Sequence, residues 1–155
     1  MDTKTMRNID LYNRISIFLE LYYQRTKQND LGGFLGISSM ILYRKEPNNP
    51  IGLERRMVDT CIWDNWLYVI GLSNLIDNDS RLSFDYGKYI EETGAVEINQ
   101  QQQHEYMLNF LKYIEQDWGY NWNQLLFDID QDSQTKRDWE NSYCLLKEYL
   151  KLGLQ

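Results

Sequence analysis

The side chains of this chain that could do acid–base or metal chemistry are few and widely spaced. His104 is the only histidine in the 155-residue sequence, and neither an HExxH motif nor a carboxylate–histidine spacing surrounds it. A metal cluster or a nucleophile–base pair would have to rest on this isolated imidazole or on isolated carboxylates. We interpret His104 as a surface or packing residue, and the sequence predicts no catalytic residue, no metal site and no cofactor.

Three acids near the C-terminal end alternate along the chain in a way that superficially resembles a calcium-binding loop. They are Asp128, Asp130 and Asp132, and Ser133 follows them. Counted from Asp128, position six is Ser133 and position twelve is Trp139, where an EF-hand loop requires glycine and glutamate. The pattern is better explained as an acidic turn that caps the last helix and favours its positive end.

Other polar clusters also lack the spacing of a known chemical site. Gly32-Gly33 has neither the lysine nor the spacing of a phosphate-binding loop, and the central acids have no metal-binding frame. Acids on loops of a rigid scaffold are nevertheless suited to meeting a basic protein partner. The candidate partner-binding residues are therefore Asp77, Asp79, Asp85, Asp128, Asp130 and Asp132.

The composition excludes several function classes. The net charge of −7 and the sequence pI of about 4.7 argue against nucleic acid or an anionic membrane as a ligand, because both require a basic footprint. The first ten residues lack the apolar core of a signal peptide, no apolar run approaches a membrane span, and Cys61 and Cys144 are isolated. We expect a cytoplasmic protein without a disulfide scaffold.

Helical periodicity dominates the chain and predicts a mainly α-helical single domain. The central stretch 72–98 is less periodic, and we expect irregular or short β structure over 82–98, with a short helix at 86–92 and an extended segment at 95–98. The predicted helices cover 9–26, 31–42, a segment from Asp59 or Thr60 to about 71, 99–117, 124–129, and a last helix from Ser133 or Thr135. Arg44 to Pro50 is predicted to be a loop.

Particular residues should build and delimit these helices. Asp30, or Asn29 before it, is predicted to cap the second helix. The glycines of that helix imply that another helix or an aromatic ring packs closely against it. The predicted core contains Phe18, Leu19, Trp63, Trp66, Phe110 and Trp139.

The two halves of the chain, 9–71 and 99–151, share a pattern that predicts two degenerate three-helix repeats. The apolar stripe at positions 15, 18, 19 and 22 recurs as Met107, Phe110, Leu111 and Ile114, a shift of 92 residues. Trp63-Asp64-Asn65 recurs as Trp139-Glu140-Asn141, a shift of 76. Both stripes follow the i, i+3, i+4, i+7 spacing of a buried helical face.

Two stretches carry a resemblance to a known family. FLELYYQRTKQNDLGGFLG, from Phe18 to Gly36, and WDNW, from Trp63 to Trp66, resemble the pattern FLExYYxRTxSDDLGxLLG…WxDW of bacterial immunity proteins from polymorphic-toxin and contact-dependent growth-inhibition loci. Here the SDD of that pattern is Gln28-Asn29-Asp30, and the acid of WDNW lies one place earlier. A role that depends on the changed positions is therefore not carried over to this chain.

The resemblance implies a cytoplasmic protein that binds a cognate toxin domain and neutralises it, usually by masking the toxin's active site. A basic toxin, such as a nuclease, would complement the acidic composition. The alternative is a general helical adaptor or regulatory module outside toxin systems, and an enzyme is the third interpretation. The toxin's identity and the oligomeric state are not predicted.

Overall fold

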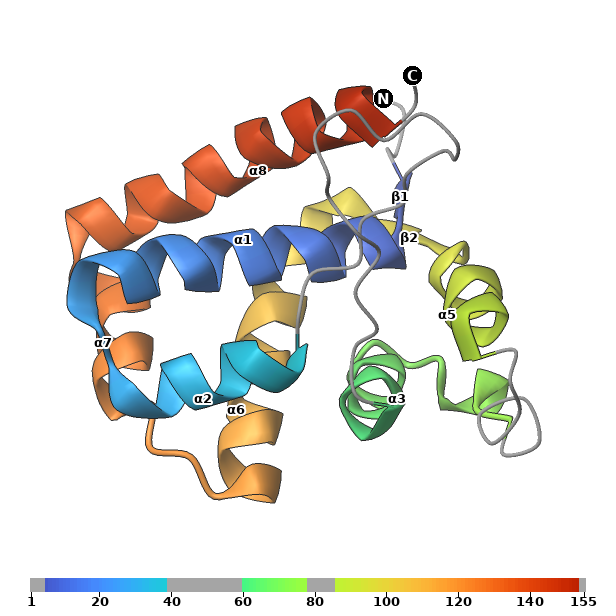
Figure 1. Ribbon diagram of the computed structural model, residues 1–155, viewed down its shortest axis with the longest axis horizontal. Helices are drawn as coiled ribbons and strands as arrows, with labels where there is room; N and C mark the ends of the chain where they lie inside the picture. The colour runs from blue at the N-terminus through green and yellow to red at the C-terminus, as the bar shows by residue number, and fades with distance from the viewer. Residues whose placement is uncertain (1–4, 39–59, 78–85, 154–155) are drawn as a thin grey trace. The chain divides into compact units, whose positions relative to one another are not determined.

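The computed structural model describes residues 5–38, 60–77 and 86–153, and these are mainly α-helical, as predicted (Figure 1). A two-stranded antiparallel sheet joins β1 to β2, and two short 3-10 helices interrupt the connections. The elements are β1 (Thr5–Arg7), α1 (Asn8–Thr26), α2 (Asn29–Ser38), α3 (Thr60–Val69), η1 (Ser73–Leu75), α5 (Tyr86–Gly94), β2 (Glu97–Asn99), η2 (Gln100–Gln102), α6 (Gln103–Trp118), α7 (Asn123–Gln131) and α8 (Ser133–Gly153).

The chain divides into two compact units, and the division falls within α1. Unit 1 comprises residues 1–12 and 59–121, and unit 2 comprises residues 13–58 and 122–155. Each unit therefore draws on both halves of the sequence and does not correspond to either predicted repeat. The duplication stays a prediction, although all eight residues of its two apolar stripes are buried.

Unit 1 is built around aromatic rings. Tyr12, from the first turns of α1, lies edge-on to Trp63 at 5.3 Å and to Trp66 at 5.9 Å, and Trp66 lies edge-on to Phe110 of α6 at 5.3 Å. Edge-to-face rings at these distances add to the stabilisation that burial already provides. The predicted burial of Trp63, Trp66 and Phe110 is confirmed.

The β1–β2 pair and α5 complete unit 1. Thr5 pairs with Asn99 and Arg7 pairs with Glu97, so the short strand predicted near 95–98 is present but pairs with a strand that the sequence pattern did not predict. A methyl group on Gly94, the last residue of α5, would lie 2.8 Å from Cβ of Ile9. Glycine at this position therefore allows α5 to approach α1 closely.

Unit 2 holds the remainder of α1 together with α2, α7 and α8. Phe18 lies edge-on to Trp139 at 5.5 Å, and Phe34 of α2 lies edge-on to Trp122 at 5.3 Å. Phe18 and Leu19 are fully buried as predicted, whereas Trp139 is only half-buried.

The boundaries of α2 differ from the prediction. The helix begins at Asn29, so Asp30 lies inside its first turn, and the prediction that Asp30 caps the helix is wrong. The side chain of Gln28 takes that role, because its Oε1 accepts a hydrogen bond from the backbone N–H of Leu31 at 2.7 Å. Lys27, with a φ of 56°, makes the turn between the two helices. The end predicted at residue 42 and the loop 44–50 lie outside the described residues.

The glycines of α2 have different surroundings. A Cβ on Gly32 would lie 2.9 Å from Cε1 of Tyr23, so an aromatic ring does pack closely there, as expected. Gly33 and Gly36 have no described atom within 4 Å of such a Cβ. Only Gly32 thus supports the close-packing explanation.

Candidate functional site

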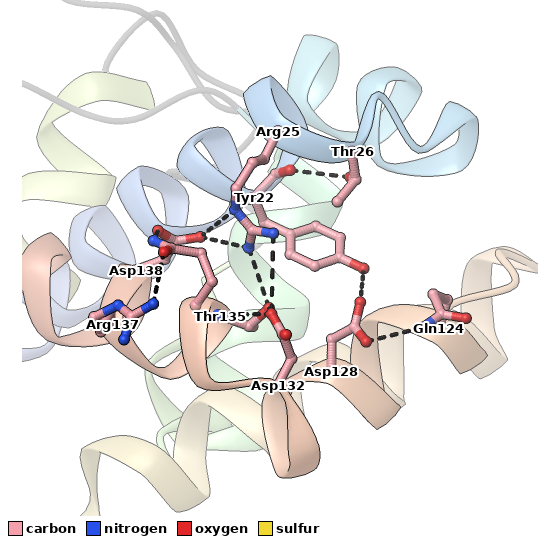
Figure 2. A network of polar contacts seen from close by, with 10 residues as sticks. Tyr22, Arg25, Thr26, Gln124, Asp128, Asp132, Thr135, Arg137 and Asp138 are labelled. Atoms are coloured by element: carbon pink, nitrogen blue, oxygen red, sulfur yellow. Dashed lines mark hydrogen bonds and ion pairs between the residues drawn. The ribbon is translucent and has the colours of Figure 1, made fainter.

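The stretch that carries the family resemblance contributes a polar network to unit 2, where α1 meets α7 and α8 (Figure 2). The hydroxyl of Tyr22 donates a hydrogen bond of 2.6 Å to one carboxylate oxygen of Asp128, and the side-chain amide of Gln124 donates to the other at 2.8 Å. Burial, and then the bond to Asp128, raise the pKa of Tyr22 well above its usual value. The hydroxyl therefore stays protonated and serves as a fixed donor.

Arg25, one helical turn further along α1, contacts α8. Its Nη2 lies 2.7 Å from Oδ2 of Asp138 and 3.1 Å from Oγ1 of Thr135, and its Nε lies 3.2 Å from the same Asp138 oxygen. Asp138 is buried, so the guanidinium compensates for the loss of water around this carboxylate.

Asp132 connects this network to the start of α8. Its Oδ2 accepts hydrogen bonds from the backbone N–H of Thr135 at 2.9 Å and from the Thr135 hydroxyl at 2.7 Å. The hydrogen bonds from Thr135, hydroxyl first, lower the pKa of Asp132, and Arg25 at 3.9 Å contributes further. The prediction that an acid here caps the last helix is confirmed for Asp132.

A buried arginine supports the opposite end of the α1–α8 contact. The guanidinium of Arg14 lies 3.7 Å from the centre of the Trp139 ring, donates to the Trp139 carbonyl at 2.7 Å, and donates to Oγ of Ser142 at 3.0 Å. Burial lowers the pKa of Arg14 to about 10, so it remains charged at neutral pH. Arg14 and Arg25 together show that α1 and α8 run antiparallel in unit 2.

The WDNW motif has a comparable role in unit 1, and its two tryptophans are tied to distant segments. Nε1 of Trp63 donates to the hydroxyl of Thr93 at 2.9 Å, and Nε1 of Trp66 donates to Oδ1 of Asn8 at 3.0 Å. The amide nitrogen of Asn8 in turn donates to the carbonyls of Thr93 and Val96 at 2.7 and 2.9 Å. Both indole N–H groups are thus satisfied within the core.

The two polar residues of the motif also accept hydrogen bonds within unit 1. Asp64 is buried and accepts a hydrogen bond of 2.5 Å from the hydroxyl of Tyr89. Asn65 accepts a hydrogen bond of 2.9 Å from Nε1 of Trp118 at the end of α6. All four side chains of WDNW therefore link α3 to other elements of the unit.

The candidate partner-binding acids differ in exposure and in the hydrogen bonds that they make. Asp128 and Asp130 lie on α7, so the prediction that they belong to an acidic turn is wrong for these two residues. The carboxylates of Asp128 and Asp132 accept hydrogen bonds within unit 2. Asp130 and Asp77 are exposed. Asp79 and Asp85 lie outside the described residues.

Two exposed aromatic side chains of the described residues were not predicted from the sequence. Tyr68 of α3 and Phe127 of α7 are 59% and 60% exposed, and Tyr68 contacts the half-buried Tyr113 of α6. The available signal was helical spacing, since Tyr68 does not fall on the apolar face that Trp63, Trp66 and their neighbours define.

The acidic character of the molecule is concentrated in one unit. Over the described residues, unit 1 carries nine Asp and Glu against three Lys and Arg, whereas unit 2 carries eight against seven. The local charge is therefore −6 in unit 1 and −1 in unit 2. Any long-range attraction for a basic partner acts mainly on unit 1.

The remaining reactive groups are dispersed. His104 is exposed near the start of α6, as predicted, and Cys61 and Cys144 are exposed on α3 and α8. Within residues 5–38, 60–77 and 86–153, no group of three His, Cys, Asp or Glu side chains is arranged to hold a metal ion. In the same ranges, no helix has the length and apolar character needed to cross a membrane.

Comparisons with known protein families, with curated proteins and with solved structures find no match to this chain.

Proposed function

We propose that this protein is an immunity protein that binds and neutralises a cognate toxin domain in the bacterial cytoplasm. The observation that carries the proposal is the role of the two family-like stretches. Residues of the first stretch hold α1 to α7 and α8 in unit 2, and WDNW joins α3 to its neighbours in unit 1. The resemblance therefore lies in the residues that determine the fold.

This placement favours the resemblance over a chance likeness between two amphipathic helices. Helical periodicity alone accounts for the buried rings of Phe18 and Tyr22, but it does not account for the Tyr22 hydroxyl or for Arg25, whose polar atoms have specific partners. Gly32 and Tyr23 also belong to the first stretch and contact each other closely. Proteins that share these residues would share these contacts.

The charge distribution supports a basic target. A toxin that acts on nucleic acid needs a cationic surface to hold the phosphate backbone, and an acidic inhibitor is both attracted to that surface and complementary to it. In this proposal the protein acts by occupying the toxin's active site and not by catalysis.

Co-expression tests this function. The proposal places a toxin domain in the gene directly upstream; that domain is produced in bacteria with and without this protein, and we expect growth to be rescued and the two proteins to purify together. A toxin domain from an unrelated locus is the control and should not be neutralised. Absence of both rescue and binding would contradict the proposal and favour a helical adaptor outside toxin systems.

A further inference from the structure

Unit 1 presents at its surface a pair of tyrosines, of which one is exposed and the other half-buried. The rings of Tyr68 on α3 and Tyr113 on α6 lie 5.4 Å apart at an interplanar angle of 44°. Tyr68 is 59% exposed, whereas Trp63, Trp66 and Phe110, the aromatic residues of these two helices that pack in the core, are completely or almost completely buried. One ring of the pair is therefore open to a ligand from the solvent side.

An acid lies beside the pair. Asp117 follows Tyr113 by one helical turn on α6, the spacing that places two side chains next to each other, and it is exposed. Partial burial, then Asp117 and then Tyr68 raise the pKa of Tyr113, and a hydrogen bond from Asn65 opposes the shift. Asn65 is itself held by Trp118, so the support behind Tyr113 is fixed.

These features suit one kind of ligand group. A guanidinium is planar, stacks on aromatic faces and binds carboxylates through its N–H groups. A tyrosine face beside an exposed carboxylate offers both contacts, and unit 1 has a threefold excess of acids over bases in its described residues. Such a surface repels nucleic acid and attracts a basic protein.

We propose that Tyr68, Tyr113 and Asp117 form a docking site for an arginine side chain of the protein partner, with the guanidinium stacked on Tyr68 and paired with Asp117. This inference rests on the proposed function in one respect, because it takes the toxin domain to be the protein that supplies the arginine. It assigns the contact to residues of unit 1 and not to the acidic segment of unit 2.

A peptide titration tests the site without the toxin. The protein, labelled with carbon-13 in its tyrosine rings, is titrated with a short peptide of alternating glycine and arginine, and tyrosine signals are assigned with single Tyr-to-Phe variants. We expect the Tyr68 and Tyr113 signals to shift more than those of the other tyrosines. The same peptide with citrulline in place of arginine has no charge and should leave them unchanged.

Matched variants separate this site from general acidity. Tyr68→Leu and Asp117→Asn should each weaken peptide binding about two- to fivefold, the change expected for losing one exposed cation–π or charge contact. The controls Phe127→Leu and Glu140→Gln make equivalent changes at exposed positions of unit 2 and should leave binding unchanged. Equal losses in both sets, or shifts spread evenly over all tyrosines, would overturn the site.

A neutralisation experiment with the toxin and the same variants distinguishes the arginine site from the immunity function. If the wild-type protein neutralises the upstream toxin at limiting expression while Tyr68→Leu and Asp117→Asn protect less well than the two controls, the site is the toxin contact. Full protection by both unit 1 variants would overturn that assignment. Failure of the wild type to protect would contradict the immunity function alone, and the peptide result would still decide whether an arginine site exists.

Discussion

At the scale of single residues, Tyr22 shows how a polar atom in the family-like stretch stabilises the fold. Its ring is fully buried, and its hydroxyl donates to Asp128. Tyr22→Phe should lower the free energy of unfolding by about 1.5 kcal/mol, the low end for a hydrogen bond to a charged group, because water can reach the half-buried Asp128. Urea unfolding measures the loss. Tyr149→Phe, at a half-buried tyrosine of α8, is the control, and an equal effect there would contradict the role of the hydroxyl.

Asp132 gives a pH-dependent contribution with a defined sign. Its pKa is lowered in the folded protein, so its charge stabilises the fold above the pKa of an unfolded aspartate, roughly pH 4, and this contribution is lost as the pH falls through the folded value. Asp132→Asn keeps an oxygen acceptor but removes the charge. The difference in unfolding free energy between wild type and variant should be constant above about pH 5 and shrink below it.

One result of this pH series would contradict the role assigned to Asp132. A difference that grows as the pH is lowered from neutrality would mean that protonation of Asp132 stabilises the folded state. The hydrogen bonds from Thr135 could not then be the cause of the shift.

At the scale of elements, periodicity was sufficient to locate the helices but not their ends. Apolar spacing predicted α1, α6 and α8 because a helix that buries one face must repeat that face along its length. The start of α2 was placed incorrectly because Asp30 and Gln28 can both supply an acceptor oxygen, and only the turn at Lys27 decides between them. β1 is three residues long, too short for an alternating pattern to be recognised.

Two variants test which residue caps the N-terminus of α2. Gln28→Ala removes the acceptor of the Leu31 N–H and should cost about 0.5–2 kcal/mol, the usual range for losing a helix cap. Asp30→Ala should cost less, since Asp30 lies inside the first turn and does not accept the Leu31 N–H, and its charge near the positive end of the helix contributes a smaller stabilisation than a cap. Thermal and urea denaturation of the two variants make the comparison. A larger loss for Asp30→Ala would restore Asp30 as the cap.

Two glycines give a matched test of helix packing. Gly94→Ala should destabilise unit 1 by about 1–3 kcal/mol, because the new methyl group overlaps Cβ of Ile9, an atom bonded to the backbone that cannot rotate away. Gly33→Ala introduces the same group into open space on the exposed face of α2 and should stabilise the protein by up to about 1 kcal/mol. Opposite signs are the expected result in denaturant unfolding. A stabilising Gly94→Ala would show that α5 does not approach Ile9 so closely.

At the scale of the whole molecule, the sequence predicted the helical class and the acidic total but not where the acid excess lies. That distribution depends on which segments join into a unit, and each unit combines stretches far apart in the chain. The candidate acids were chosen by local spacing, which cannot show that Asp128 and Asp132 bind within unit 2. The Tyr68–Tyr113 pair was equally hidden, because its two residues come from helices that are not neighbours in sequence.

The last prediction concerns capture of the proposed basic toxin domain. Opposite charges accelerate association, and salt weakens this effect because the screening length is only about 10 Å at 0.1 M ionic strength. We expect the association rate measured by stopped flow to fall about tenfold or more from low to high salt.

Neutralising two exposed acids of unit 1, as Asp77→Asn with Asp117→Asn, should lower the low-salt rate and flatten its salt dependence. The matched pair in unit 2, Asp130→Asn with Glu140→Gln, removes the same charge and should change the rate less. If both pairs slow association equally, the total charge governs capture, and the concentration of acids in unit 1 has no directing role.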